Sequence, residues 1–386
     1  MTTAVLRRTI GALVGTALLA VTGLPPAWSQ GAVDGVTWAP AAPGGAPSVP
    51  PATARAYLLM DADTGQILAE RNADDLLPVA STVKLLTTLT ALETLDLDQR
   101  ITVGEEVAVG GAGTGLRPGD TWTVAQLLDA TIARSGNDAA RALAVAAAGD
   151  LEAFAARMRL TAERMGLDGA VLDEPTGLAD TNRLSARHLA IIAAAALDHP
   201  GIRAAGGRPA VTLPGIGTIA SRNLFLDQFP GATGLKTGFT EAAGYCFVGS
   251  AERDGRELVA VVLGAREDPA RFTEAGALLG MVFDRYVPTP LPPWRLRTAG
   301  GWVSAPPGIG HVWAPGDATV AIELAPPSGV DGDVRAQLGW GGGVVVDLTA
   351  RVDARSAAPE TVGARLVDAA YAAMRTAHRR QLWPAA

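Results

Sequence analysis

The sequence is poor in cysteine and histidine, and each shortage excludes a class of protein. The single cysteine, Cys246, rules out an internal disulfide, and its apolar setting in GYCFVGSA favours a buried structural residue over a reactive thiol or a dimer link. None of the four histidines stands in a catalytic motif, which argues against a Ser-His-Asp hydrolase. The four are His188, His199, His311 and His378. No His/Cys/Asp cluster has metal-ligand spacing, so we expect neither a metal nor another cofactor.

Lysine is also nearly absent. Of the 32 basic residues only Lys84 and Lys236 are lysines, and the other thirty are arginines. Arginine keeps its proton in proteins, whereas a buried lysine can lose it and act as a base. A chain that uses arginine elsewhere is expected to keep lysine where a neutral amine is needed. The net charge of −7 argues against a nucleic-acid partner.

The N-terminal segment has the features of an export signal. Residues 1–29 join a short basic start with Arg7 and Arg8 to the apolar run TIGALVGTALLAVTGL, which is shorter than the ~20 residues of a spanning helix. A cleavage site is expected before Gln30, and an uncleaved anchor is the alternative. Residues 30–53 are rich in Pro, Ala and Gly and are expected to form a linker. The sequence therefore predicts an exported protein of the periplasm or cell envelope.

The rest of the chain, with 386 residues in all, has room for two or three domains. Apolar runs on either side of Asp63-Thr64-Gly65 and of Asp254-Gly255 predict two antiparallel strand pairs. Ser185 is the expected N-cap of a helix. Further helices are expected from Thr82 and over residues 122–149, 151–166 and 271–286. Residues 290–352 predict a small all-β domain, and residues 353–386 a terminal helix.

The first candidate for chemistry is the pair Ser81 and Lys84 in PVASTVKLLTT. Residues three apart at the start of a helix share one face, so the amine can reach the hydroxyl. A neutral amine could take the serine proton and create a nucleophile. Free N–H groups at the helix start could stabilise an oxyanion. The alternative is an ordinary capped helix with a surface lysine, because Ser-x-x-Lys alone is a weak signal.

Two further motifs strengthen the first. Ser135-Gly136-Asn137 opens a helix in ATIARSGNDAARALA, and Lys236-Thr237-Gly238 opens an apolar strand in GLKTGFT. The order S-x-x-K, S-x-N and K-T-G is that of penicillin-binding proteins and class A β-lactamases.

The sequence resembles the serine-type D-alanyl-D-alanine carboxypeptidases, the low-molecular-mass penicillin-binding proteins. The likeness extends over residues 54–289 and includes MDADTGQILAERNAD, LSARHLA and GLKTGFTEAAGYCFVGSA. It implies an α/β (α+β) fold of the penicillin-binding and β-lactamase-like transpeptidase type, with an antiparallel sheet flanked by helices. The small β domain and terminal helix match only in layout.

The resemblance implies the catalytic roles. Ser81 would attack the carbonyl between the two terminal D-alanines of a peptidoglycan stem peptide, with Lys84 as general base. Ser135 would relay protons to the leaving D-alanine. Asn137 would hold substrate amides and orient Lys84. Lys236 would stay charged, stabilise the proton network and help bind substrate.

It also implies the binding roles. Thr237 would bind the terminal carboxylate beside Gly238, and the backbone N–H groups of Ser81 and Phe239 would form the oxyanion hole. Arg271, in PARFTE, would help bind the carboxylate, although an arginine on a surface helix is the alternative. Water would hydrolyse the acyl-enzyme, and β-lactam antibiotics would trap Ser81 as a slow ester.

Two segments depart from the family. DEPTGLAD has Glu174 where the family usually has asparagine. Class A β-lactamases have a Glu-Pro in a comparable place, so one hypothesis is that Glu174 activates the deacylating water. The following Thr-Gly-Leu instead favours a loop residue in a solvated turn. The terminal helix has a thin apolar stripe and several arginines, which predict either weak contact with a membrane surface or packing on the protein itself.

Other functions remain open at this point. A β-lactamase or a D,D-endopeptidase could use the same fold, but the extra β domain and the lack of a class A deacylation motif argue against the β-lactamase. A non-catalytic cell-wall binding module is disfavoured by the intact Ser81, Lys84 and Ser135.

Overall fold

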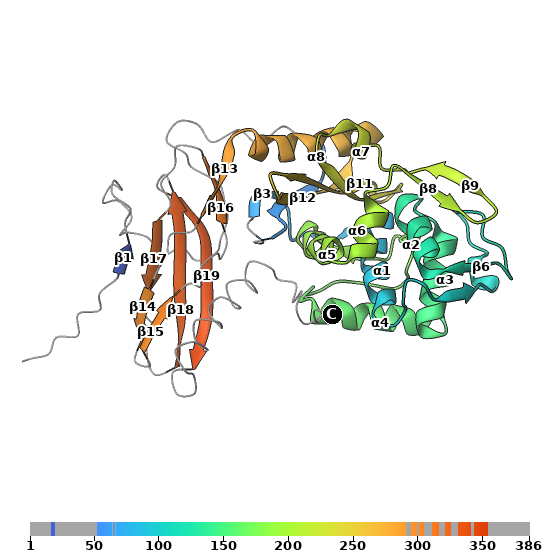
Figure 1. Ribbon diagram of the computed structural model, residues 1–386, viewed down its shortest axis with the longest axis horizontal. Helices are drawn as coiled ribbons and strands as arrows, with labels where there is room; N and C mark the ends of the chain where they lie inside the picture. The colour runs from blue at the N-terminus through green and yellow to red at the C-terminus, as the bar shows by residue number, and fades with distance from the viewer. Residues whose placement is uncertain are drawn as a thin grey trace, which may run out of the picture. The chain divides into compact units, whose positions relative to one another are not determined.

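The computed structural model describes residues 52–290 except Thr64 and Gln66, together with strands at 17–19, 295–298, 301–304, 311–315, 321–325, 331–340 and 343–353. The chain divides into two compact units (Figure 1). Of the described residues, the larger unit contains 52–289 and 311–315, and the smaller unit contains 17–19, 290, 295–304, 321–325 and 331–353 within their described strands.

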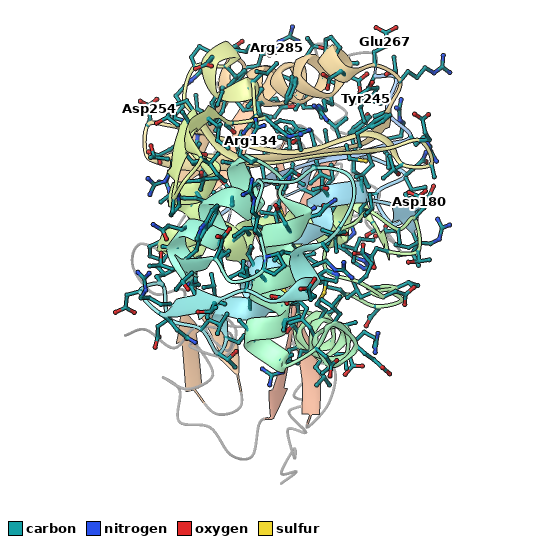
Figure 2. All side chains as sticks on the ribbon, turned by 90° about the vertical axis from the view of Figure 1, so that its right-hand side faces the viewer. Arg134, Asp180, Tyr245, Asp254, Glu267 and Arg285 are labelled. Carbon is teal, nitrogen blue, oxygen red and sulfur yellow. The ribbon has the colours of Figure 1, made fainter. Side chains whose placement is uncertain are left out.

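The larger unit is built on an antiparallel sheet of five strands in the order β10-β11-β12-β2-β3. The strands are β2 (Ala56–Asp61), β3 (Ile67–Arg71), β10 (Ala232–Thr240), β11 (Gly244–Arg253) and β12 (Arg256–Ala265). The predicted strand pairs around residues 63–65 and 254–255 are confirmed as β2–β3 and β11–β12. Figure 2 shows Asp254 at one end of this sheet and Tyr245 at the other.

Helices cover both faces of the sheet, which explains why its central strands are apolar without alternation. Helix α8 (Asp268–Phe283) packs on β11 and β12 from above, and α5 (Ala186–Asp198) packs on β12 and β2 from below (Figure 1). Helix α1 (Lys84–Leu92) lies at the centre of the remaining helices, and all nine of its residues are buried. Around it are α2 (Val124–Ala133), α3 (Asn137–Ala148) and α4 (Leu151–Arg164), and α6 (Pro200–Gly206) packs on α2 and α5.

Short elements connect these layers. They are β4 (Leu77–Pro78), the 3₁₀ helix η2 (Ala80–Val83), β5 (Arg100–Thr102), the 3₁₀ helix η3 (Glu105–Val107), β6 (Thr121–Thr123), β7 (Arg183–Leu184), β8 (Ala210–Leu213), β9 (Gly217–Ala220), α7 (Phe225–Gln228) and β13 (Tyr286–Pro290). Strand β13 pairs with β16 (His311–Pro315).

Several helix limits differ from the prediction. The helix expected over 122–149 is two helices, because Ser135 adopts a left-handed backbone (φ 63°) that an α-helix cannot contain. The last helix begins at Asp268 and ends at Phe283 rather than spanning 271–286, since Pro269 is well suited to a first helical turn. The helix expected from Thr82 begins as the 3₁₀ helix η2 and becomes α-helical at Lys84.

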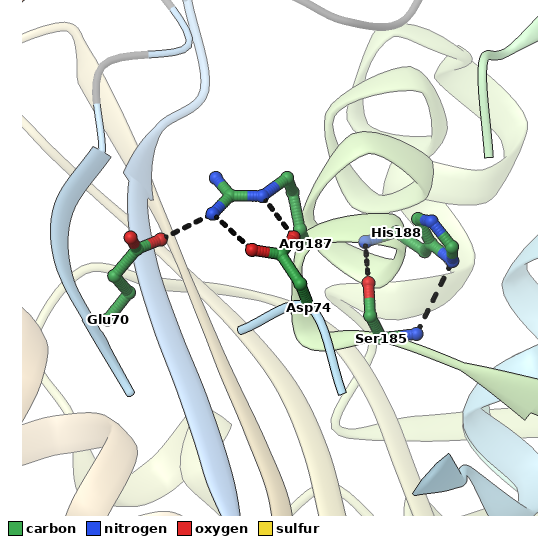
Figure 3. A network of polar contacts seen from close by, with 5 residues as sticks. All are labelled: Glu70, Asp74, Ser185, Arg187 and His188. Carbon is green, nitrogen blue, oxygen red and sulfur yellow. Dashed lines mark hydrogen bonds and ion pairs between the residues drawn. The ribbon is translucent and has the colours of Figure 1, made fainter. Parts of the chain in front are cut away.

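The start of α5 is fixed by a polar network (Figure 3). Ser185 is its N-cap, as predicted: the Ser185 hydroxyl accepts from the His188 N–H at 3.1 Å, and the His188 ring accepts from the Ser185 N–H at 3.4 Å. Arg187 forms ion pairs with Glu70 of β3 and with Asp74, each at 2.7 Å. These contacts anchor α5 to the edge of the sheet and to the segment that leads into η2.

In the smaller unit, β1 (Ala17–Leu19), β17 (Ala321–Ala325), β18 (Asp331–Trp340) and β19 (Gly343–Asp353) form a sheet in the order β1-β17-β18-β19. β14 (Arg295–Thr298) and β15 (Gly301–Ser304) form a hairpin. Every described residue from 295 to 353 lies in a strand, as expected for an all-β domain. The predicted domain limits themselves remain predictions.

The predicted export signal and the predicted terminal helix lie mostly outside the described residues. Of the export signal only β1 is described, and the residues of the expected terminal helix after Asp353 are not described. Among the helices that the structure describes, none combines the length and apolarity needed to cross a bilayer.

Candidate active site

The three motifs meet at a cleft of about 480 Å³ at the edge of β10. Seven of the predicted site residues line it, namely Ser81, Ser135, Asn137, Thr237, Gly238, Phe239 and Arg271. Lys84 and Lys236 are fully buried beneath it. The structure therefore brings together all nine site residues that the sequence predicts.

The Ser81 hydroxyl lies beside the Lys84 amine. Lys84 Nζ is 2.9 Å from Ser81 Oγ, 2.7 Å from Asn137 Oδ1 and 2.5 Å from the Thr176 carbonyl oxygen. Asn137 Nδ2 donates to the Gly110 carbonyl at 2.8 Å, which turns its oxygen toward Lys84. The alternative of a surface lysine is wrong, because Lys84 has no exposed surface.

The surroundings of Lys84 favour its neutral form. Burial lowers the pKa of Lys84 to about 7, although Glu174 and Asp138 oppose this shift and Arg222 reinforces it. No carboxylate oxygen of the described residues forms an ion pair with Lys84. A large fraction of the amine is thus unprotonated near neutral pH.

The neutral amine matches its three contacts in number and kind. The Asn137 oxygen and the Thr176 carbonyl can only accept, so each takes one of the two N–H groups of Lys84. The lone pair is then left for the third contact, which is the Ser81 hydroxyl. In this state the Ser81 hydroxyl donates a hydrogen bond to Lys84 Nζ.

The second lysine lies under the second serine. Lys236 Nζ donates to Ser135 Oγ at 2.9 Å and to the Thr237 carbonyl at 2.7 Å. Burial is the largest cause that lowers the pKa of Lys236 well below its ordinary value; the charges of Lys84 when it is protonated, of Arg271 and of Arg222 lower it further.

The backbone is strained at one motif position, Ser135, and at the residue before Ser81. Ala80, just before the predicted nucleophile, has φ 47°, and Ser135 has φ 63°, both in the left-handed region that non-glycine residues avoid. The Asp138 carboxylate, which was not among the predicted site residues, accepts from the Thr114 N–H at 2.7 Å and the Leu116 N–H at 3.2 Å. It thereby ties the turn at Ser135 to the loop that closes this side of the cleft.

Two glycines allow close packing around the nucleophile. A Cβ on Gly238 would lie 3.0 Å from the Ser81 backbone nitrogen, so glycine lets β10 run directly beside the start of η2. A Cβ on Gly177 would lie 2.0 Å from the Ala80 carbonyl oxygen. Phe239, the next residue along β10, also lines the cleft.

Arg271 is not a surface arginine. It is buried at the start of α8, donates to the Gly238 carbonyl at 3.1 Å and pairs with Asp268 at 2.5 Å. A second guanidinium in the cleft, Arg222, was not predicted. Its backbone N–H donates to the Ala133 carbonyl at 2.9 Å, which brings it beside the second motif, and no pattern in a single sequence marks that contact.

The remaining candidates lie away from the chemistry. Cys246 is buried in β11, where burial raises the pKa of its thiol to about 11, in agreement with a structural role. His188 and His199 do not line the cleft. Among the described residues no three His, Cys, Asp or Glu side chains gather as a metal site, and the expectation of no metal remains a prediction.

Comparison with known proteins identifies the family. A family model described as D-alanyl-D-alanine carboxypeptidase matches residues 44–267, more than half of the chain. The chain belongs to this family of serine peptidases. The predicted resemblance, the fold class and the assignment as a D-Ala-D-Ala carboxypeptidase are thus confirmed.

Two curated relatives and one solved structure illustrate the similarity. D-alanyl-D-alanine carboxypeptidase DacB2 of Mycobacterium tuberculosis is 36% identical over 230 residues, which cover 57% of this chain and 78% of the relative. DacC of Escherichia coli K12 is 36% identical over 248 residues, and this chain spans 61% of its length. The structure of ampicillin-bound penicillin-binding protein D2 from Listeria monocytogenes has a TM-score of 0.55 at 30% identity and covers 60% of this chain and 98% of that one. The family acts on peptidoglycan peptides and binds β-lactams.

Proposed function

We propose that this carboxypeptidase removes the terminal D-alanine from peptidoglycan stem pentapeptides through an acyl-enzyme on Ser81. The observation that carries the proposal is the 2.9 Å contact between Ser81 Oγ and the buried Lys84 Nζ, an amine with a pKa of about 7. As Oγ bonds to the carbonyl carbon between the two D-alanines, its proton passes to Lys84. The geometry supports this role for both residues.

The remaining steps use the other residues of the cleft. The backbone N–H groups of Ser81 and Phe239 hold the oxyanion of the tetrahedral intermediate. When the C–N bond breaks, Ser135 passes a proton to the departing amine of D-alanine. The proton that Lys84 took from Ser81 then replaces the proton that Ser135 gave up, so that both Ser135 and Lys84 return to their starting states. Lys84 then takes a proton from the water that attacks the ester, and Ser81 recovers its hydrogen as the shortened peptide leaves.

The positive charge of the cleft suits the carboxylate of the last D-alanine. Lys236 lies near Arg271 and Arg222, and burial, followed by repulsion from these charges, lowers the pKa of Lys236. A bound carboxylate offsets that repulsion and favours the charged form of Lys236. Thr237 and Gly238 lie at the same end of the cleft, where the Thr237 hydroxyl binds the carboxylate.

Mass spectrometry after brief exposure to penicillin tests this function. We expect wild-type protein to gain the mass of one penicilloyl group and Ser81→Ala to gain none, because the alanine has no hydroxyl to acylate. A D-Ala-D-Ala peptide should then release free D-alanine with wild type only.

Other outcomes would favour the alternatives. Rapid destruction of penicillin without a lasting adduct would indicate a β-lactamase. An intact antibiotic and an unmodified protein would favour a binding module. Cleavage of cross-linked dimeric peptides would add D,D-endopeptidase activity.

The pH dependence of acylation reports on Lys84. Only the neutral amine accepts a proton, so the second-order rate constant for acylation should rise with pH through about 7 and level off above it. Fluorescent penicillin, used between pH 5 and 9, gives this profile. Lys236→Arg is the control. Its rate constant should rise with pH over the same range as that of wild type, since arginine does not titrate in this range. A rate independent of pH would contradict the role of Lys84.

We further propose that the protein is exported by the signal in residues 1–29 and acts in the periplasm or cell envelope, in peptidoglycan biosynthesis. The apolar core and the site before Gln30 support this. The thin apolar stripe and the added arginines of residues 353–386 support weak contact with the outer face of the cytoplasmic membrane.

A further inference from the structure

The Glu174 loop, defined as residues 173–182, passes directly behind the nucleophile. Its Thr176 carbonyl accepts from Lys84 Nζ at 2.5 Å and lies 3.4 Å from Ser81 Oγ. Its Gly177 packs against the Ala80 carbonyl so closely that a Cβ would not fit. The loop is therefore part of the wall that holds Ser81 and Lys84 together.

The Glu174 carboxylate binds this loop from within. One oxygen accepts from the Thr176 N–H at 2.7 Å and the Thr176 hydroxyl at 2.5 Å. The other accepts from the Gly177 N–H and from Asn182 Nδ2, the latter at 3.2 Å. Asn182 also donates to the Glu174 carbonyl at 2.8 Å. Both carboxylate oxygens are thus occupied by the loop, and Glu174 does not line the cleft.

One peptide group connects Glu174 with Lys84. The N–H of Gly177 and the C=O of Thr176 belong to the same planar unit, in which they point in opposite directions. The N–H is bound by Glu174 and the C=O by Lys84. Fixing the N–H therefore fixes the direction of the carbonyl that holds the amine.

We propose that Glu174 is a positioning residue for Lys84, acting through the Thr176–Gly177 peptide. The inference rests on the proposed function of Lys84 as the base. It replaces the hypothesis of water activation, since both oxygens of Glu174 already accept hydrogen bonds from its own loop.

The charge of Glu174 provides a second readout. Four charged groups face Lys84. Glu174 and Asp138 raise the pKa of Lys84, and Arg222 lowers it. The fourth is Lys236, whose own pKa is lowered by the charge of Lys84. Loss of the carboxylate charge should therefore lower the pKa of Lys84. A purely structural role in the loop would not move it.

Three variants test the proposal. Glu174→Gln keeps the length and removes the charge, Glu174→Asp keeps the charge and shortens the side chain, and Glu163→Gln removes an exposed carboxylate on α4 as a control. Acylation by penicillin is measured against pH for each. We expect Glu174→Gln to lose about a hundredfold in the plateau rate constant and to shift its acidic limb to lower pH. Glu174→Asp should lose rate with little shift, and Glu163→Gln should match wild type.

Each other outcome overturns the proposal. If Glu174→Gln had the plateau rate constant of wild type and the same acidic limb of its pH profile, the carboxylate would have no role. A lower rate with an unmoved limb would leave a structural role only. Normal acylation with a longer-lived adduct would restore the hypothesis of water activation. If Glu174→Gln does not fold, a wild-type rate in Glu174→Asp is the contradicting result.

Failure of the proposed function is distinguishable from failure of this inference. If wild-type protein formed no adduct, the function would fail before any variant was compared. The chain has only two lysines, so ¹³C-labelled lysine would still report the titration of Lys84 by NMR. An identical titration in wild type and Glu174→Gln would then overturn the inference by itself.

Discussion

Lys84→Arg is expected to lower the second-order rate constant for acylation by penicillin about 10³-fold. A guanidinium keeps its proton at neutral pH and has no lone pair for the Ser81 hydroxyl. The contacts of Lys84 with Asn137 and Thr176 need two donors, and the catalytic step needs an acceptor as well. Arginine supplies only the donors. Stopped-flow measurement with a fluorescent penicillin gives the rate constant.

Lys236→Arg is the matched control, since it makes the same change at the only other lysine. A permanent cation can serve beside Ser135 and the substrate carboxylate, so we expect a loss of only about tenfold, from the strain of fitting a larger buried side chain. Equal losses in the two variants, with both proteins folded, would contradict the distinction between a base at Lys84 and a cation at Lys236.

Gly177→Ala is expected to destabilise the protein by about 3 kcal/mol and to abolish measurable acylation. The new methyl group would lie 2.0 Å from the Ala80 carbonyl oxygen, and the backbone at φ 71° already disfavours any residue but glycine. Relief of this clash requires the Glu174 loop to move off Ser81 and Lys84. Denaturant unfolding and the acylation assay measure the two effects.

Gly119→Ala separates the clash from the backbone effect. Gly119 also has a left-handed backbone (φ 89°), but a Cβ there meets nothing within 4 Å. We expect a cost of about 1 kcal/mol and normal acylation. If Gly177→Ala behaved like Gly119→Ala, the close packing of the loop on the nucleophile would be wrong.

The local part of the site could be predicted from the sequence. The spacing of Ser81 and Lys84 places them on one helical face, and the structure has them in contact. The scarcity of lysine pointed to the two buried amines, because arginine cannot replace a lysine that must lose its proton. The order of the three motifs then indicated the family.

The long-range part of the site could not be predicted from spacing. Lys84 meets Asn137 and the Thr176 carbonyl across 53 and 92 positions, and Lys236 meets Ser135 across 101. The contact with Thr176 uses a backbone oxygen, which any residue type could supply. Glu174 was noticed as a departure from the family, but its bonds to its own loop depend on a turn that the sequence does not specify.

The most direct test of the account is the titration of Lys84 in protein labelled with ¹³C-lysine. Lys236→Arg leaves a single lysine, so the one remaining NMR signal belongs to Lys84. We predict that this signal titrates near pH 7, where the amine becomes the base for Ser81. A titration near pH 10.4, the ordinary value for lysine, would show that the amine is protonated at neutral pH and would contradict the account.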